Sequence, residues 1–238
     1  MFSFLGMAHA VTANQATMEC PLILLSGMGA DARVFAPQLT RFPQLQVPEW
    51  IPPTPNESMA EYAKRFASQI DPGKRCYIGG ASFGGMIAME MMQHLDVEGC
   101  FLIGSVRKPS ELPPVVRALR MIAPAAKVFP YGGVKLMLRL ARLVFKPILS
   151  RSLQSVMMQA ENADSAFMRW AMFALLSWKT IPNETAPVYH IHGEKDRVLP
   201  VRYTSPTHII PGGGHPISMR HGKAVNEFIA EVIASKIV

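Results

Sequence analysis

The sequence predicts an α/β fold in which a mostly parallel, doubly wound sheet carries helices on both faces. Short apolar runs without alternation, typical of strands buried on both faces, recur along the chain. Segments with helical spacing separate most of these runs, as in successive strand–helix–strand units. The chain has 238 residues, of which 49% are hydrophobic and 17% charged, so it can bury one large core.

The expected elements alternate along the chain. Strands are predicted at 21–26, 45–51, 74–80, 99–105, 187–192 and 207–210. Helices are predicted at 33–42, 58–70, 83–95 and 221–237. Ser58 and Glu61 form a capping box at the start of the second helix. Residues 83–95 are apolar on nearly every side, which indicates a buried helix.

Residues 106–180 interrupt this alternation. They contain no clear strand, but four segments have helical spacing: 115–122, 134–145, 153–160 and 167–178. We therefore expect a core formed by residues 1–105 and 181–238, with a helical cap inserted at about 106–180.

The cap carries the positive charge of the chain. The net charge is +7, and residues 106–180 hold twelve Lys and Arg against three acidic residues, which leaves the remainder slightly negative. Such a field attracts acidic partners, for example an acidic carrier protein or an anionic surface. The residues expected to bind such a partner are Arg117, Arg120, Arg139 and Arg142. A solvated helix face that keeps the protein soluble is the alternative.

The apolar runs and the cysteine content indicate the cellular compartment of the protein. No apolar run reaches the about 18 to 20 residues that a membrane-spanning helix needs, so we expect no transmembrane segment. Three cysteines, Cys20, Cys76 and Cys100, cannot form a closed disulfide framework. We expect a cytoplasmic protein. Residues 2–11 are apolar and contain the Ala-x-Ala pattern Ala8-His9-Ala10, but they lack the positive charge of a secretion signal.

The segment Gly80-Ala81-Ser82-Phe83-Gly84 follows a predicted strand and opens a predicted helix. This is the G-x-S-x-G pattern in the context that a nucleophile elbow requires. The sharp turn places the serine at its apex in a strained conformation, and only very small residues fit around it. The helix N-terminus, with its free N–H groups, then lies beside the Ser82 hydroxyl.

Two further residues follow predicted strands. Asp196 comes after the penultimate strand and His215 after the last one, so both belong to the edge where an open sheet builds its site. A serine hydroxyl needs a histidine to take its proton and an acid to orient that histidine. We interpret Asp196 as this acid. The order Ser82, Asp196, His215 predicts a catalytic triad.

On these motifs the chain resembles the α/β-hydrolase superfamily, from Leu22 to the closing helix, and its small size and helical insertion are similar to the carboxylesterases. The resemblance implies a sheet of the α/β-hydrolase type. It also implies an oxyanion hole formed by the backbone N–H groups of Met28 and Phe83. Asp196, and not the nearby Glu194 in the same loop, matches the position of the acid in this family. Members commonly have His-Gly in the oxyanion loop, whereas this chain has Ser26-Gly27. The support of that loop must therefore differ.

Two other patterns suggest binding sites. Residues 27–32 fit G-x-G-x-x-A after a strand, with Glu49 about twenty residues later, as in dinucleotide-binding proteins. The helix that follows is short and contains Pro37, so we expect no nucleotide cofactor. His190 and His192 alternate on one strand as metal ligands could, but no third ligand stands nearby, and we expect no metal. We expect no nucleic-acid partner either.

The sequence thus predicts a serine hydrolase that cleaves carboxylic esters through a Ser-His-Asp triad and an acyl-enzyme. The expected substrate is a small ester with an apolar acyl group, because the cap is rich in methionine and can adapt to such groups. Two alternatives stay open. The enzyme would act on esters or thioesters presented by an acidic carrier protein, or the chain would be a non-catalytic binding protein on the same fold.

Overall fold

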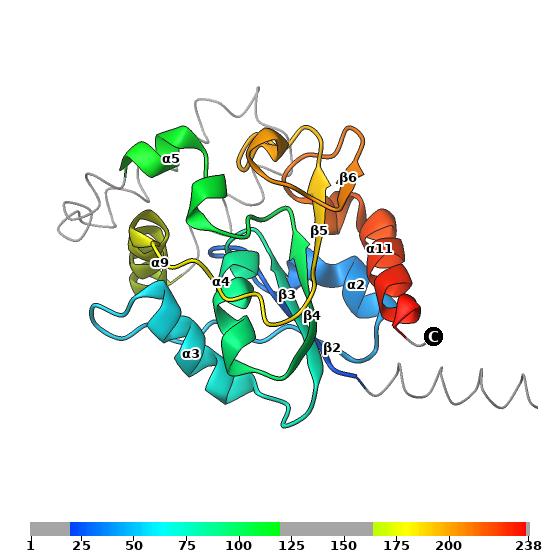
Figure 1. Cartoon of the computed structure of the whole chain (residues 1–238), viewed down its shortest axis with the longest axis horizontal. Helices are drawn as coiled ribbons and strands as arrows, with labels where there is room; N and C mark the ends of the chain where they lie inside the picture. Colours follow the sequence, from blue (N-terminus) through cyan, green and yellow to red (C-terminus); the bar gives the residue numbers. More distant parts are fainter. Residues whose placement is uncertain (1–19, 120–163, 237–238) are drawn as a thin grey trace, which may run out of the picture.

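The computed structural model describes residues 20–119 and 164–236, and six strands in these residues form one parallel sheet (Figure 1). The strands are β1 (Leu22–Leu25), β2 (Leu45–Gln46), β3 (Cys76–Ala81), β4 (Val97–Ile103), β5 (Val188–Gly193) and β6 (His208–Ile210). Their order in the sheet is β2-β1-β3-β4-β5-β6, and every neighbouring pair is parallel. The predicted α/β-hydrolase fold class is confirmed.

Helices cover both faces of the sheet, as Figure 1 shows. One face carries α3 (Met59–Ile70) and α4 (Phe83–Met91), with α9 (Ser165–Ser177) packed on α3, and the other carries α2 (Ala36–Arg41) and α11 (Gly222–Ser235). Short elements join them: η1 (Ala32–Phe35), η2 (Met92–His94), η3 (Pro109–Glu111), α5 (Pro114–Leu119), η5 (Val201–Tyr203) and α10 (Ile217–Arg220). Successive residues of β1 belong to opposite cores, which explains why its sequence is apolar without alternation.

The local signals for two helices are confirmed. At the start of α3, Ser58 N–H donates to Glu61 Oε2 over 2.8 Å and Glu61 N–H donates to Ser58 Oγ over 3.3 Å, which completes the capping box. All nine residues of α4 are buried, as its apolar character predicts. The helix ends at Met91, earlier than predicted, and continues as the 3-10 turn η2.

The strand predicted at 45–51 is mostly wrong, because only Leu45 and Gln46 pair with β1. β2 lies at the edge of the sheet, and Pro48 has no N–H to extend the ladder. The helix predicted at 33–42 is also divided, since its first turn is the 3-10 turn η1. Both differences lie at the ends of elements: β2 stops before a proline, and the predicted helix starts with a 3-10 turn.

Part of the predicted cap lies among the described residues. α5 and α9 correspond to two of its four expected helices, whereas the helices predicted at 134–145 and 153–160 lie outside the described residues. α9 packs on α3, where the Trp170 ring stacks on Tyr62 at 4.1 Å and Trp170 Nε1–H donates to Glu57 O over 2.8 Å. No helix in the described part of the chain is long and apolar enough to cross a membrane.

Candidate active site

Ser82 occupies a strained turn between β3 and α4. Its φ of 53° and ψ of −119° lie in a region that L-residues rarely adopt. Gly84, two residues later, permits this turn because an added Cβ would lie 2.2 Å from the carbonyl oxygens of Leu25 and Ser26. The Ser105 hydroxyl donates to Ser82 O over 2.6 Å. The elbow therefore projects Ser82 from the carboxyl edge of the sheet, as the motif predicts.

The structure brings Ser82, His215 and Asp196 together in one line of hydrogen bonds. Nε2 of His215 lies 3.0 Å from Ser82 Oγ, and its Nδ1 lies 2.8 Å from Asp196 Oδ2. The Asp196 carboxylate can only accept, so Nδ1 carries the hydrogen and Nε2 is free to accept from Ser82. This is the geometry that a general base needs to take a proton from a serine.

The Asp196 carboxylate is fully buried and surrounded by donors. Oδ1 accepts from the N–H groups of Val198 and Leu199 over 2.8 and 3.0 Å. Oδ2 faces His215 Nδ1 at 2.8 Å and His192 Nε2 at 3.3 Å. Burial raises the pKa of Asp196, but the hydrogen bonds from His192, His215 and Leu199 outweigh burial and lower it below its ordinary value. The acid therefore stays ionised.

The loops that carry Asp196 and His215 are fastened to each other. A Cβ on Gly193 would lie 2.4 Å from Gly214 O, so only glycine permits the two loops to approach this closely. Lys195 N–H donates to Gly213 O over 2.7 Å, and Gly212 N–H donates to Glu194 Oε2 over 2.7 Å. Sequence reasoning gave Glu194 no role, and the structure shows it fastening these two loops. The glycine run at 212–214 is the signal that could have indicated such a contact.

The loop after β1 lies alongside Ser82. A Cβ on Gly27 would lie 3.8 Å from Ser82 Cβ. Ser26 Oγ donates to Ala30 O over 2.8 Å and Ala30 N–H donates to Gly27 O over 3.0 Å, which folds residues 26–30 into a tight turn. These bonds are the support that replaces the usual histidine. Phe83 is the first residue of α4, so its N–H has no acceptor within the helix.

Aromatic side chains form an apolar wall next to the elbow. The Trp50 ring lies 5.9 Å from Phe83 and 5.2 Å from Phe167 between centroids, and Trp170 packs against Phe83 at 6.1 Å. Trp50 and Met28 are only partly buried, so this wall retains accessible apolar surface. An apolar group bound beside Ser82 would therefore contact side chains of matching polarity.

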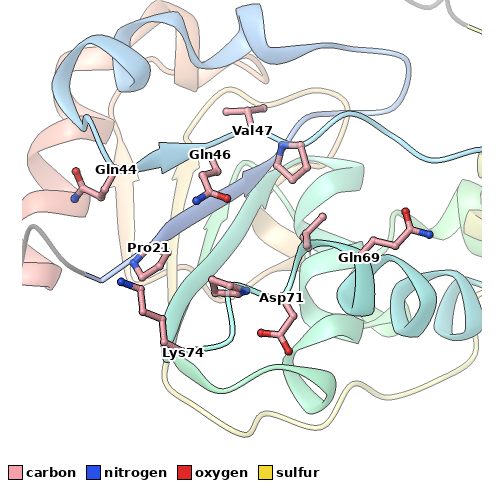
Figure 2. A pocket seen from close by; sticks show the side chains of 10 residues that line it. Pro21, Gln44, Gln46, Val47, Gln69, Asp71 and Lys74 are labelled. Carbon is pink, nitrogen blue, oxygen red and sulfur yellow. The ribbon is translucent and has the colours of Figure 1, made fainter.

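The glycine loop and the two histidines, whose sequence patterns suggested other binding sites, both lie close to the residues described above. The glycine loop at 27–32 leads into η1 and the six-residue α2, without the long helix of a dinucleotide site. His190 and His192 bond to each other, and His192 also bonds to Leu199 O in the loop that carries Asp196. A separate pocket, lined in part by Pro21, Gln46 and Lys74, lies beside the amino ends of β1 and β3 (Figure 2).

Comparisons with known proteins agree with this architecture. The family model described as "Alpha/beta hydrolase family" matches residues 17–228. A comparison with curated protein sequences gave no match.

Similar solved structures share the fold at low sequence identity. A thermophilic esterase from Thermogutta terrifontis is 18% identical with a TM-score of 0.64, covering 92% of this chain and 90% of its own. The enol-lactonase from Burkholderia xenovorans is 15% identical with a TM-score of 0.63, covering 90% of this chain and 91% of its own. MenH from S. aureus is 16% identical with a TM-score of 0.67, covering 92% of this chain and 94% of its own.

Proposed function

The chain belongs to the alpha/beta hydrolase family, and from this premise we propose that it hydrolyses carboxylic esters with Ser82 as the nucleophile. The observation that carries the proposal is the unbroken hydrogen-bonded line from Ser82 Oγ through His215 to the buried Asp196 carboxylate. A non-catalytic binding protein would have no use for a strained serine aligned with an oriented imidazole.

The first half of the reaction forms an acyl-enzyme. Ser82 Oγ attacks the carbonyl carbon of the ester while His215 Nε2 takes the hydroxyl proton. The N–H groups of Met28 and Phe83 stabilise the oxyanion, and the N-terminal end of α4 adds its positive partial charge. The tetrahedral intermediate then collapses. The bond to the alcohol oxygen breaks, and His215 returns the proton to the leaving alcohol.

The second half releases the acid. Water attacks the acyl carbonyl and gives its proton to His215, and the bond to Ser82 Oγ breaks as the serine recovers that proton. Asp196 acts through His215 in both halves. Because it accepts from Nδ1–H, it holds the imidazole in the tautomer that leaves Nε2 free, and its charge stabilises the imidazolium.

The substrate that fits this site best is a small ester with an apolar acyl group. The wall formed by Trp50, Phe83 and Phe167 supports this choice, as does the half-buried side chain of Met28. We also propose that residues 106–180 form a helical cap over the core. The packing of Trp170 on Tyr62 supports this division, because it joins α9 to the core next to the apolar wall.

The experiment that tests the function is covalent labelling combined with an ester panel. A p-nitrophenyl alkylphosphonate should add one phosphonyl group to Ser82, located by mass spectrometry of the digested protein. Hydrolysis of p-nitrophenyl esters should rise in kcat/KM from acetate toward longer acyl chains and then level off. Absence of labelling together with absence of hydrolysis would favour the binding-protein alternative.

A further inference from the structure

Two buried histidines lie behind Asp196, and the proposed mechanism uses neither of them. His190 and His192 stand two residues apart on β5 and have no solvent exposure. Nε2 of His190 lies 3.0 Å from Nδ1 of His192. Nε2 of His192 lies 2.7 Å from Leu199 O and 3.3 Å from Asp196 Oδ2. The two imidazoles therefore form a chain that ends at the acid of the triad.

The neighbours of these rings determine their tautomers. Leu199 O and the Asp196 carboxylate can only accept, so His192 Nε2 carries a hydrogen. In the neutral ring Nδ1 then accepts, and the donor is His190 Nε2–H. The opposite tautomer of His190 would set two lone pairs against each other.

His190 is suited to this fixed role because it stays neutral. Burial lowers its pKa to about 3, and the neighbouring His192 and Arg107 act in the same direction. A neutral His190 keeps donating to His192 across the physiological range, so the hydrogen on His192 stays at Nε2.

The turn of residues 196–199 is stabilised by two sets of contacts, one from the His192 ring and one from its own backbone N–H groups. Its Nε2–H lies between Leu199 O and Asp196 Oδ2, and the Leu199 N–H donates to Asp196 Oδ1 over 3.0 Å. Without the imidazole, the buried carbonyl of Leu199 would lose its donor and Oδ2 would keep His215 alone. The backbone N–H groups would then hold the carboxylate through Oδ1 alone, and the position of Oδ2 relative to the His215 ring would be less fixed.

We propose that His192, fixed in its Nε2–H form by His190, is a positioning residue that locks the carboxylate of Asp196 onto Nδ1–H of His215. The kinetic part of this inference rests on the proposed ester hydrolysis, whereas the hydrogen-bond pattern itself does not.

The hydrogen-bond pattern is tested first by NMR on the wild-type protein and on Ser82→Ala. Long-range ¹H–¹⁵N spectra of imidazoles distinguish a protonated from an unprotonated ring nitrogen, and the His192 signals are assigned by their loss in His192→Gln. We expect the Nε2–H form for both buried rings and a downfield Nδ1 proton for His215. An Nδ1–H form of His192 overturns the proposal. Because Ser82→Ala is included, this result does not depend on esterase activity.

The kinetic test compares two substitutions at one position. His192→Leu removes the donor, and we expect kcat to fall by about tenfold or more with little change in KM, as for loss of a hydrogen bond to a charged group. The downfield proton of His215 should weaken or disappear in the same variant. His192→Gln places an amide N–H near the original Nε2. It should therefore restore most of the kcat and most of the intensity of the downfield His215 proton. Gln38→Leu, which removes a buried amide between α2 and α11, should lower stability and leave kcat unchanged.

The outcomes separate the two hypotheses. A folded His192→Leu protein with kcat within about twofold of wild type and an unchanged His215 proton overturns the positioning role. If His192→Leu does not fold, the positioning role is tested by the tautomer of His192 in the wild-type protein and by the kcat of His192→Gln. If the wild-type protein hydrolyses no ester, the proposed function has failed. The loss or retention of the His215 proton in the His192 variants then still decides this inference.

Discussion

The hydroxyl of Ser105 donates to the carbonyl oxygen of Ser82 over 2.6 Å, which fastens the end of β4 to the nucleophile elbow. Ser105 is fully buried and lies two residues after β4, so it reaches the elbow from the neighbouring strand. Ser82 O also accepts from the N–H groups of Gly85 and Met86 over 3.1 and 3.4 Å, and the Ser105 hydroxyl adds a shorter bond from the neighbouring strand. This bond holds the elbow in the conformation that aims Ser82 Oγ at His215.

We expect Ser105→Ala to reduce kcat by about tenfold and the free energy of unfolding by about 1 kcal/mol, because it removes one buried hydrogen bond at the elbow. Steady-state kinetics and urea unfolding measure the two effects. Ser177→Ala removes a similar hydroxyl-to-carbonyl bond within α9 and is the matched control, expected to spare kcat. Equal loss of kcat in both variants would contradict a specific role for Ser105.

Substitutions of Ser82 should separate chemistry from strain. Ser82→Ala and Ser82→Gly both remove the nucleophile, so both should lose at least about 10³-fold in kcat. Glycine accepts a φ of 53° far more readily than alanine, and Ser82→Gly should unfold with a free energy about 1 kcal/mol higher than Ser82→Ala. Thermal and urea unfolding of the two variants test this ranking. A more stable alanine variant would show that the turn is not strained.

The two carboxylates of the loop after β5 should differ in effect. Asp196→Asn should lower kcat by roughly 10⁴-fold, because an amide that donates to His215 favours the wrong tautomer. Glu194→Gln keeps an acceptor for Gly212 N–H and should cost far less activity. Measuring kcat for both variants with one p-nitrophenyl ester is sufficient. A larger loss in Glu194→Gln would transfer the role of the acid to Glu194.

Stability should fall at acid pH because His190 is buried in its neutral form. Its pKa of about 3 in the folded state lies below the 6.5 of an unfolded histidine, so the unfolded chain binds an extra proton between these values. The free energy of unfolding should therefore decrease as pH falls from about 6.5 to 3, with His190 contributing up to about 1.4 kcal/mol per pH unit. His190→Gln should flatten this slope in urea unfolding. An unchanged slope would mean that His190 is protonated in the folded protein.

The charge of the predicted cap should influence charged substrates alone. Screening shortens electrostatic attraction to about 10 Å at 0.1 M salt, so rising salt should lower kcat/KM for an acyl ester on an acidic carrier protein and spare a small neutral ester. Arg139→Glu/Arg142→Glu should abolish this difference. Lys74→Glu/Lys236→Glu makes the same change of charge at exposed residues of the core and is the control. Equal salt dependence for both substrates would leave the basic cap as a solubility feature.

Much of the fold and the residues of the candidate triad could be predicted because their signals are local. The apolar run of β1, the capping box of Ser58 and Glu61, and the glycine that flanks Ser82 each express a steric or hydrogen-bonding requirement of a few neighbouring residues. The positions of Asp196 and His215 after the last two strands follow from the common edge of a parallel sheet.

The sequence by itself therefore determined the fold class and the strand–helix turn at Ser82, and it indicated Asp196 and His215 as the other candidate triad residues. Only the tertiary structure decided that Ser105 supports the elbow, that Glu194 fastens the histidine loop and that His192 reaches Asp196. These contacts depend on the register between strands, where Leu102 lies beside His190 and Ile191 beside His208. The register between strands is set by the packing of both faces of the sheet against the two hydrophobic cores. A local pattern of residues therefore does not specify which side chains from different strands meet within hydrogen-bonding distance.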